Sequence, residues 1–240
     1  MDKNNYKVLI MTSGTGSRLK DLTKDTNKAL VEINGRATID YVLEKYSKEI
    51  PLVVTLGYLS GQVKEYLLEN HKDRNFEFVI IDKYIGEGSS LVYSLLQAKD
   101  NLQCPFVFHA CDTIMTEEIS VPDKNWIAGF LKEKAQKNGM ELSQYRTHKV
   151  ESGKIIKLLD KGVGGFESVH IGLDGIKDYE EFWKTAQEVY DNDPANQSLS
   201  EVHILNKMLG NGVSFEWMPY SVWLDTGNLE ALEKTKKYLI

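Results

Sequence analysis

The stretch YKVLIMTSGTGSRL, residues 6–19, joins an apolar run to a loop that contains two glycines and an arginine. A short apolar run that ends in small residues is typical of a buried strand in an α/β protein. Glycine has no Cβ, so the backbone N–H groups around Gly14 and Gly16 can approach an anion closely. We therefore predict a strand followed by a phosphate-binding loop, with Arg18 placed to neutralise the phosphate charge.

The loop differs from two better-known phosphate motifs. It lacks the GK[ST] ending of a Walker A loop, and Leu19 stands where a dinucleotide fingerprint has its third glycine. Cations follow instead, at Arg18, Lys20, Lys24 and Lys28, which suits a polyphosphate better than a neutral sugar. A glycine-containing turn between a strand and a helix, with a solvated charged face, explains the same residues without any ligand.

The segments around this loop alternate between two periodicities. Short apolar runs predict strands over residues 6–12, 51–57, 76–82 and 105–110, and helical patterns lie between them over residues 37–49, 60–70 and 89–100. The second half predicts strands over 153–159, 167–173 and 213–218, and helices over 178–190, 199–209 and 228–239. The predicted fold is α/β and Rossmann-like, with a mainly parallel mixed sheet flanked by helices and a smaller mixed lobe that completes a cleft.

Polar residues lie where several of these strands end, and ligands of open α/β sheets collect at such ends. Asp112 follows the strand over 105–110, and Asp225 precedes Thr226 and Gly227. A carboxylate there can bind a divalent cation together with phosphate oxygens, although an isolated Asp also commonly caps a turn. Gly88 and Ser89 precede a helix and leave room for a flat base, and a serine there can equally be an N-cap.

Composition narrows the class of protein. The chain has 240 residues, 42% hydrophobic and 27% charged, and its formal net charge of −6 argues against general nucleic-acid binding. We expect Cys104 and Cys111, its two cysteines, to be reduced thiols. No apolar run is long enough to span a bilayer, and the first residues lack the apolar core of a secretory signal. We expect a cytoplasmic protein with no membrane partner.

The order of these motifs resembles the sugar-phosphate nucleotidyltransferase family, also called nucleoside-diphosphate-sugar pyrophosphorylases, which includes small phosphocholine cytidylyltransferases. The resemblance covers residues 6–239. The family's opening GxGxRL loop is similar to Gly14–Leu19, and its closing W-x-D-x-G to Trp223–Gly227. Weaker matches join them at Lys28, Gly88–Ser89, Asp112 and Asp160–Lys161. The chain departs from the pattern at Met11–Ser13, which replace small residues, at Asn27, which replaces proline, and at Asp160, which replaces glutamate.

The resemblance implies a Mg²⁺-dependent nucleotidyltransferase that condenses a nucleoside triphosphate with a phosphorylated small-molecule acceptor and releases pyrophosphate. A sugar 1-phosphate is the first expectation, for cell-surface polysaccharide biosynthesis. One domain would span residues 1–240, with a nucleotide-binding half over about 1–115 and an acceptor-binding half over about 116–240. The implied catalytic residues are Arg18 and Lys28. The implied binding residues are Ser13, Gly14, Thr15, Gly16, Gly88 and Ser89 for nucleotide, Lys161 and Glu201 for acceptor, and Asp112 and Asp225 for Mg²⁺.

Other readings of the sequence stay open. A cytidylyltransferase acting on phosphocholine or another phosphorylated amino alcohol fits the same motifs. A non-catalytic nucleotide-sensing subunit could keep the glycine loop and lose the metal ligands, so the presence of both Asp112 and Asp225 counts against it. A glycosyltransferase would show a DxD motif, and a nicotinamide oxidoreductase an acidic residue after its second strand, where this chain has Thr55-Leu-Gly57. The five histidines lack metal-ligand spacing, so we expect them at structural or surface positions. A homo-oligomer is compatible with the sequence.

Overall fold

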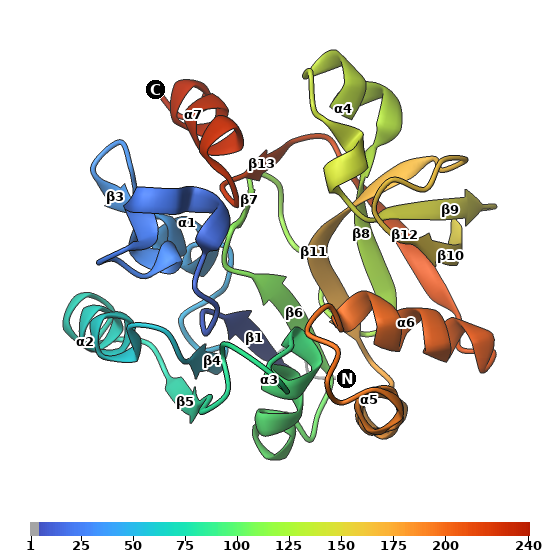
Figure 1. Ribbon diagram of the computed structural model, residues 1–240, viewed down its shortest axis with the longest axis horizontal. Coiled ribbons are helices and arrows are strands. Elements are labelled where there is room, and N and C mark those ends of the chain that lie inside the picture. Colours follow the sequence, from blue (N-terminus) through green and yellow to red (C-terminus); the bar gives the residue numbers. More distant parts are fainter. Residues whose placement is uncertain (1–4) are drawn as a thin grey trace.

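A computed structural model describes residues 5–240 of the chain. Its main element is a nine-stranded sheet with the order β5-β4-β1-β6-β11-β8-β12-β10-β9 (Figure 1). Four neighbouring strands are parallel: β1 (Lys7–Met11), β4 (Leu52–Leu56), β5 (Phe76–Ile80) and β6 (Phe106–Ala110). Each one corresponds to an apolar run of the sequence, so the four strands predicted in the first half are confirmed.

The smaller mixed part expected in the second half continues the same sheet. β11 (Ser168–Ile176) runs antiparallel to both β6 and β8 (Trp126–Leu131). β12 (Phe215–Tyr220) is parallel to β8, and the antiparallel strands β10 (Lys154–Leu159) and β9 (Thr147–Glu151) complete the order. The predicted α/β fold with a mixed sheet is confirmed. The sequence analysis did not predict β8 or β9.

Helices cover both faces of the sheet. They are α1 (Thr38–Leu43), α2 (Ser60–Asn70), α3 (Leu91–Gln97), α4 (Lys132–Lys137), α5 (Tyr179–Asn192), α6 (Glu201–Gly210) and α7 (Leu229–Tyr238). Short 3₁₀ helices occupy four connections: η1 (Ser17–Thr23), η2 (Lys28–Leu30), η3 (Lys99–Asn101) and η4 (Leu142–Gln144).

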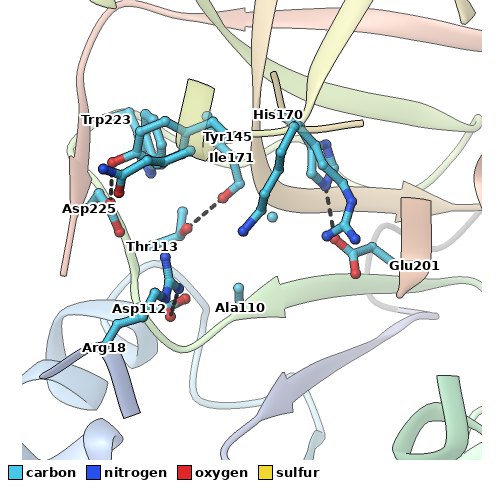
Figure 2. A pocket seen from close by; sticks show the side chains of 14 residues that line it. Arg18, Ala110, Asp112, Thr113, Tyr145, His170, Ile171, Glu201, Trp223 and Asp225 are labelled. Carbon is cyan, nitrogen blue, oxygen red and sulfur yellow. Dashed lines mark hydrogen bonds and ion pairs between the residues drawn. The ribbon is translucent and has the colours of Figure 1, made fainter. Parts of the chain in front are cut away.

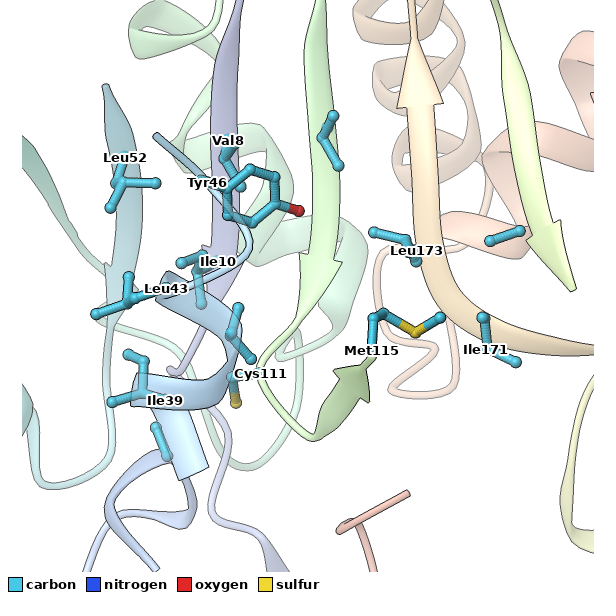
Figure 3. Packing of buried hydrophobic residues seen from close by; sticks show 14 of the residues in the cluster. Val8, Ile10, Ile39, Leu43, Tyr46, Leu52, Cys111, Met115, Ile171 and Leu173 are labelled. Atoms are coloured by element: carbon cyan, nitrogen blue, oxygen red, sulfur yellow. The ribbon is translucent and has the colours of Figure 1, made fainter. Parts of the chain in front are cut away.

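Alternation along β1 divides the core into two clusters. Val8 and Ile10 pack on one face with side chains of α1, α2 and α4 (Figure 3). Leu9 and Met11 pack on the other face with side chains of α3, α5 and α6. Successive strand residues point to opposite faces, so a strand buried on both sides must be apolar throughout. This is why the strand runs of the first half are so readable in the sequence.

The helix predicted over 37–49 is shorter in the structure, because α1 ends at Leu43. The guanidinium of Arg74 donates to the carbonyl oxygens of Leu43, at 2.8 Å, and of Tyr46, at 3.1 Å. These bonds satisfy carbonyls that the helix leaves open where it stops. A residue distant in the sequence therefore helps to end a segment whose own pattern would continue.

Two small antiparallel sheets lie outside the main one. β2 (Glu32–Ile33) pairs with β3 (Arg36–Ala37), and β13 (Trp223–Asp225) pairs with β7 (Thr113–Met115). In the second pair Asp225 lies opposite Thr113, which directly follows Asp112. This pairing joins the end of the chain to the end of β6. Within residues 5–240, no helix combines the length and apolar character needed to cross a membrane.

Candidate functional site

The loop after β1 is held in place by hydrogen bonds from Asn27 and faces open space at Gly14. Asn27 is fully buried, and its amide donates to the carbonyl oxygens of Thr12, at 3.1 Å, and Tyr58, at 2.6 Å. Its side-chain oxygen also accepts a bond from Ala29 at the start of η2. A Cβ added to Gly14 would meet no atom within 4 Å. Asn27, which replaces the family's proline, thus holds the loop in place while Gly14 faces open space.

Gly16 is required by local packing as well as by the role that its sequence context indicates. Its φ is +67°, and a Cβ there would lie 2.9 Å from the Cβ of Lys28 and 3.0 Å from a methyl carbon of Thr23. Any side chain at Gly16 would therefore be strained and would push against Lys28. We predicted that Gly16 lets the backbone approach an anion, and the structure adds an internal reason, which is the placement of Lys28.

Asp112 and Asp225 come together through the β7–β13 pairing. The backbone N–H of Thr226 donates to the carbonyl oxygen of Asp112 at 3.0 Å, which fixes the two turns side by side. A Cβ added to Gly227 would lie 3.1 Å from Oδ1 of Asp225, 3.2 Å from Oδ2 of Asp112 and 2.9 Å from Nη2 of Arg18. Two carboxylates and a guanidinium therefore converge on one point above this glycine.

Two cations face Asp112. Lys28 Nζ lies 3.4 Å and Arg18 Nη2 lies 3.9 Å from its Oδ2. Burial opposes ionisation, but the charges of Lys28 and Arg18 together hold the pKa of Asp112 below its usual value. Burial likewise works against the charge of Lys28, yet Asp112 raises its pKa overall. At neutral pH all three groups are ionised, so the site carries positive charge next to an acidic group.

The pKa of Asp225 is shifted in the opposite direction to that of Asp112. Its carboxylate accepts bonds from the N–H of Gly227 at 2.8 Å and from the hydroxyl of Tyr145 at 2.7 Å. Burial, and after it the negative charge of Asp112, raise the pKa of Asp225. Two carboxylates that repel each other across a shared point are a donor set that fits Mg²⁺, which takes one or two protein carboxylates plus substrate oxygens. Residues 5–240 hold no cluster of three or more His, Cys, Asp or Glu side chains placed to bind a metal.

A pocket of about 150 Å³ opens beside these carboxylates (Figure 2). Five predicted site residues line it: Arg18, Asp112, Lys161, Glu201 and Asp225. The side chains that the sequence analysis missed there are chiefly Tyr145, Arg146, His170 and Trp223. Tyr145 and Arg146 precede β9, an unpredicted strand, and carry no motif that could have revealed them. Trp223 was noted only as part of a motif.

Three cations line the pocket: Arg18, Arg146 and Lys161. Arg146 is held by Asp160, with Nε 3.3 Å from Oδ1, and by the carbonyl oxygen of Ser198 at 3.3 Å. Burial, followed by the charges of Arg18 and Arg146, lowers the pKa of Lys161. A bound anion would offset the repulsion between these positive charges. Asp160, which replaces the family's glutamate, serves here to orient Arg146.

Gly88 and Ser89 do not line this pocket. Gly88 has a φ of +79°, and the Ser89 hydroxyl donates to the carbonyl oxygen of Gly86 at 2.6 Å. Ser90, rather than Ser89, is the N-cap of α3, since its oxygen accepts from the N–H of Tyr93. Ser13, Gly14, Thr15, Gly16 and Lys28 also lie outside the pocket lining, and Lys28 reaches it only through Asp112.

The histidines include one exception to the expectation. His109 is buried and structural: its ring bonds Tyr46 Oη at 2.7 Å and the carbonyl oxygen of Thr113 at 2.8 Å, and burial lowers its pKa to about 4. His170, by contrast, lines the pocket next to Glu201. Spacing could not reveal this, because His170 and Glu201 lie on separate elements.

Comparison with known proteins finds a matching family model, similar curated proteins and similar solved structures. The family model described as Nucleotidyl transferase matches residues 7–119. The CTP:phosphoglutamine cytidylyltransferase of Campylobacter jejuni is 31% identical over 187 residues, covering 69% of this chain and 70% of that protein. The choline-phosphate cytidylyltransferase of Streptococcus pneumoniae is 35% identical over 107 residues, covering 43% of this chain and 44% of that protein.

The fold is similar over almost the whole chain to a solved structure of CTP:phosphocholine cytidylyltransferase from Streptococcus pneumoniae. The TM-score is 0.73 at 18% identity, with 98% of this chain and 100% of the other covered. The chain spans about half the length of several curated relatives that it matches.

Proposed function

Because the chain belongs to the nucleotidyl transferase family, we propose that it transfers a nucleotidyl group from a nucleoside triphosphate to a phosphorylated small molecule and releases pyrophosphate. The observation that carries the proposal is the meeting of Arg18, Asp112 and Asp225 above Gly227, at the mouth of a pocket lined by further cations. Such a site can hold two phosphate-bearing substrates whose charges would otherwise repel.

In the proposed reaction, an oxygen of the acceptor phosphate attacks the α-phosphorus of the triphosphate in line, and pyrophosphate leaves. The open backbone at Gly14, with Ser13, Thr15 and Gly16, binds the triphosphate, and Gly88 and Ser89 lie against the base. Arg18 and Lys28 neutralise charge that develops in the transition state. The acceptor phosphate is already anionic at neutral pH, so no protein base is required.

Asp112 and Asp225 are the residues that would hold Mg²⁺. The ion, when bound, supplies charge neutralisation on the phosphate oxygens. In the protein itself, Lys28 and Arg18 keep Asp112 ionised, while Tyr145 and the N–H of Gly227 orient Asp225. Lys161 and Arg146, which also line the pocket, add positive charge that favours an anionic acceptor.

The acceptor belongs to the same proposal. Residues of about 1–115 supply the nucleotide contacts and residues of about 116–240 the acceptor contacts, within one domain. Relatives are named for choline phosphate and for phosphoglutamine, and structures of similar fold include a UDP-glucose pyrophosphorylase with UDP-glucose. A sugar 1-phosphate is our first candidate, with a role in activating building blocks of cell-surface polysaccharides, and a phosphorylated amino alcohol or amide is the second.

Pyrophosphate release tests the proposal. We expect the full chain to turn over one of CTP, UTP, GTP, dTTP and ATP in the presence of Mg²⁺ and a phosphorylated acceptor, and to stop in EDTA. Asp112→Asn and Asp225→Asn should each lower kcat by about two orders of magnitude, because each removes a charge next to the reacting phosphates. The exposed Asp123→Asn is the matched control and should change nothing. Near-normal rates in either site variant would contradict the assignment of these carboxylates.

A further inference from the structure

A chain of buried side chains lies behind the pocket and ends at Glu201. His148 on β9 and His170 on β11 face each other, with His148 Nε2 3.0 Å from His170 Nδ1. His170 Nε2 lies 3.1 Å from Oε1 of Glu201, the first residue of α6 (Figure 2). His148 is fully buried, and His170 and Glu201 are less than a tenth exposed. Three segments far apart in sequence thus combine to hold one carboxylate.

The contacts determine where the protons lie. Oε1 of an ionised Glu201 can only accept, so His170 must carry a proton on Nε2. His148 is neutral, since burial, and then the charge of His170, hold its pKa well below the usual value. Its Nε2 can therefore accept from Nδ1 of a doubly protonated His170. Glu201 is then paired with a cation. Burial alone would raise the pKa of Glu201, but the hydrogen bond and charge of His170 outweigh burial and lower this pKa overall.

The second oxygen of Glu201 has no such partner. Oε2 is buried and makes no hydrogen bond within residues 5–240, although Glu201 lines the pocket. Buried carboxylate oxygens without a donor are costly and rare in folded proteins. Two donors of the pocket lining are engaged elsewhere: the Thr113 hydroxyl donates to the carbonyl oxygen of Ile171, and Arg146 donates to Asp160 and to the carbonyl oxygen of Ser198. A ligand that reaches Glu201 in the pocket can supply the missing donor.

The pocket therefore has two chemically different sides. Figure 2 shows Arg18 and Asp112 on one side of it and His170 with Glu201 on the other, with Ala110 between them. An acceptor whose phosphate lies near Arg18 would extend its other end toward Glu201. That end must offer an N–H or O–H group to satisfy Oε2.

Resting on the proposed function, we propose that this site selects phosphorylated acceptors that carry a hydrogen-bond donor at the end remote from the phosphate, read by Glu201. Hydroxyls of a sugar or cyclitol phosphate supply it, as does a primary ammonium or amide. A quaternary ammonium does not, because its nitrogen carries only carbon. His170 is a positioning residue, which orients Glu201 and keeps it ionised.

Phosphoethanolamine and phosphocholine provide a matched pair of probes, because they differ only in whether nitrogen carries hydrogen or methyl groups. We would measure Kd for both, and for glucose 1-phosphate, by calorimetry on the full chain with Mg²⁺. Phosphoethanolamine and glucose 1-phosphate both carry hydrogen-bond donors. Whichever of them binds more tightly should have a Kd about tenfold or more below that of phosphocholine, as expected for a hydrogen bond to a charged group. The same panel tells an N–H source from an O–H source.

Equal or tighter binding of phosphocholine overturns the inference, and so does failure of all three probes to bind. These outcomes are separate from the proposed function, which fails only if no triphosphate yields pyrophosphate with any acceptor. An enzyme that turns over phosphocholine best would keep the proposed function and lose this inference.

Variants test the role of the buried chain. Glu201→Gln should raise the acceptor KM about tenfold or more and leave the triphosphate KM unchanged, because only the acceptor meets Oε2. His170→Asn should raise the same KM, while His170→Gln, which can still donate toward Glu201, should restore part of it. Glu180→Gln, at an exposed position in the first turn of α5, is the control. Equal changes in both KM values, or no change in either, would contradict the assignment.

Discussion

Gly227 illustrates how one missing side chain can shape a reactive site. The three charged groups that converge above it leave space only because the residue has no Cβ. No positive φ constrains Gly227, so its backbone can accept alanine without strain. Glycine is therefore needed at 227 because the charged groups occupy the space of a side chain, and not because of the backbone conformation of the turn. Gly16 differs, because its φ of +67° already favours glycine.

Gly227→Ala should consequently separate activity from stability. The added methyl would lie against Arg18, Asp112 and Asp225, so we expect kcat/KM to fall by about two orders of magnitude or more. The melting temperature should change by no more than a few degrees. Gly61→Ala, in open space on α2, is the control and should alter neither. A fully active Gly227→Ala enzyme would show that the phosphates bind elsewhere.

At the level of elements, the start of α6 determines where Glu201 lies. Ser200 is the N-cap, and His203 Nδ1 accepts from the backbone N–H of Ser200 at 3.1 Å. The histidine thereby takes the place of the Glu or Gln that usually completes a capping box. Glu201 follows as the first helical residue, where the helix dipole favours a negative charge.

His203→Ala should lower the free energy of unfolding by about 1 kcal/mol, because it leaves the backbone N–H of Ser200 without its acceptor. His203→Gln should recover most of that loss, since glutamine can accept in the same position. Urea denaturation of both variants gives the comparison. If both variants lose the same stability, packing of the imidazole ring, and not the cap, accounts for it.

On the scale of the whole molecule, the β6–β11 pairing makes the two halves one sheet and encloses charge within it. Asp174 lies on β11, where it is 1% exposed and neither carboxylate oxygen has a hydrogen-bond partner in the described chain. Burial raises its pKa to about 7, with His170 opposing this rise and Glu201 adding to it. Arg146 and His148 are the other charged or titratable groups that act on this cluster.

This carboxyl should make stability depend on pH. Its pKa is higher in the folded chain than the ordinary value of 3.8, so its contribution is fully present below that value and is lost as pH rises through about 7. Asp174→Asn removes the group that must ionise. We therefore expect the variant to gain melting temperature over the wild type at pH 8, and to gain less or nothing at pH 5. A difference that is the same at both pH values would contradict the assignment.

Much of the fold was readable in the sequence, because its signals are local. The parallel strands β1, β4 and β6 are buried on both faces and therefore appear as largely apolar runs. The last helix was predicted over 228–239, and Asn228 is its N-cap, accepting from the N–H of Ala231. β9, with its mixed burial pattern, gave no such signal, and the contact with Arg74 that ends α1 early is not local either.

By itself, therefore, the sequence determined the four parallel strands and most of the helices in their chain order, the glycine loop after β1, and the presence of carboxylates at Asp112 and Asp225. Only the tertiary structure decided that these two carboxylates meet above Gly227, and that Tyr145, Arg146 and His170 share their pocket. The physical reason is that helix and strand formation depend on neighbouring residues, whereas the site depends on pairing between distant segments. The β7–β13 and β6–β11 pairings bring these segments together, and the register of neither pairing can be read from a local sequence pattern.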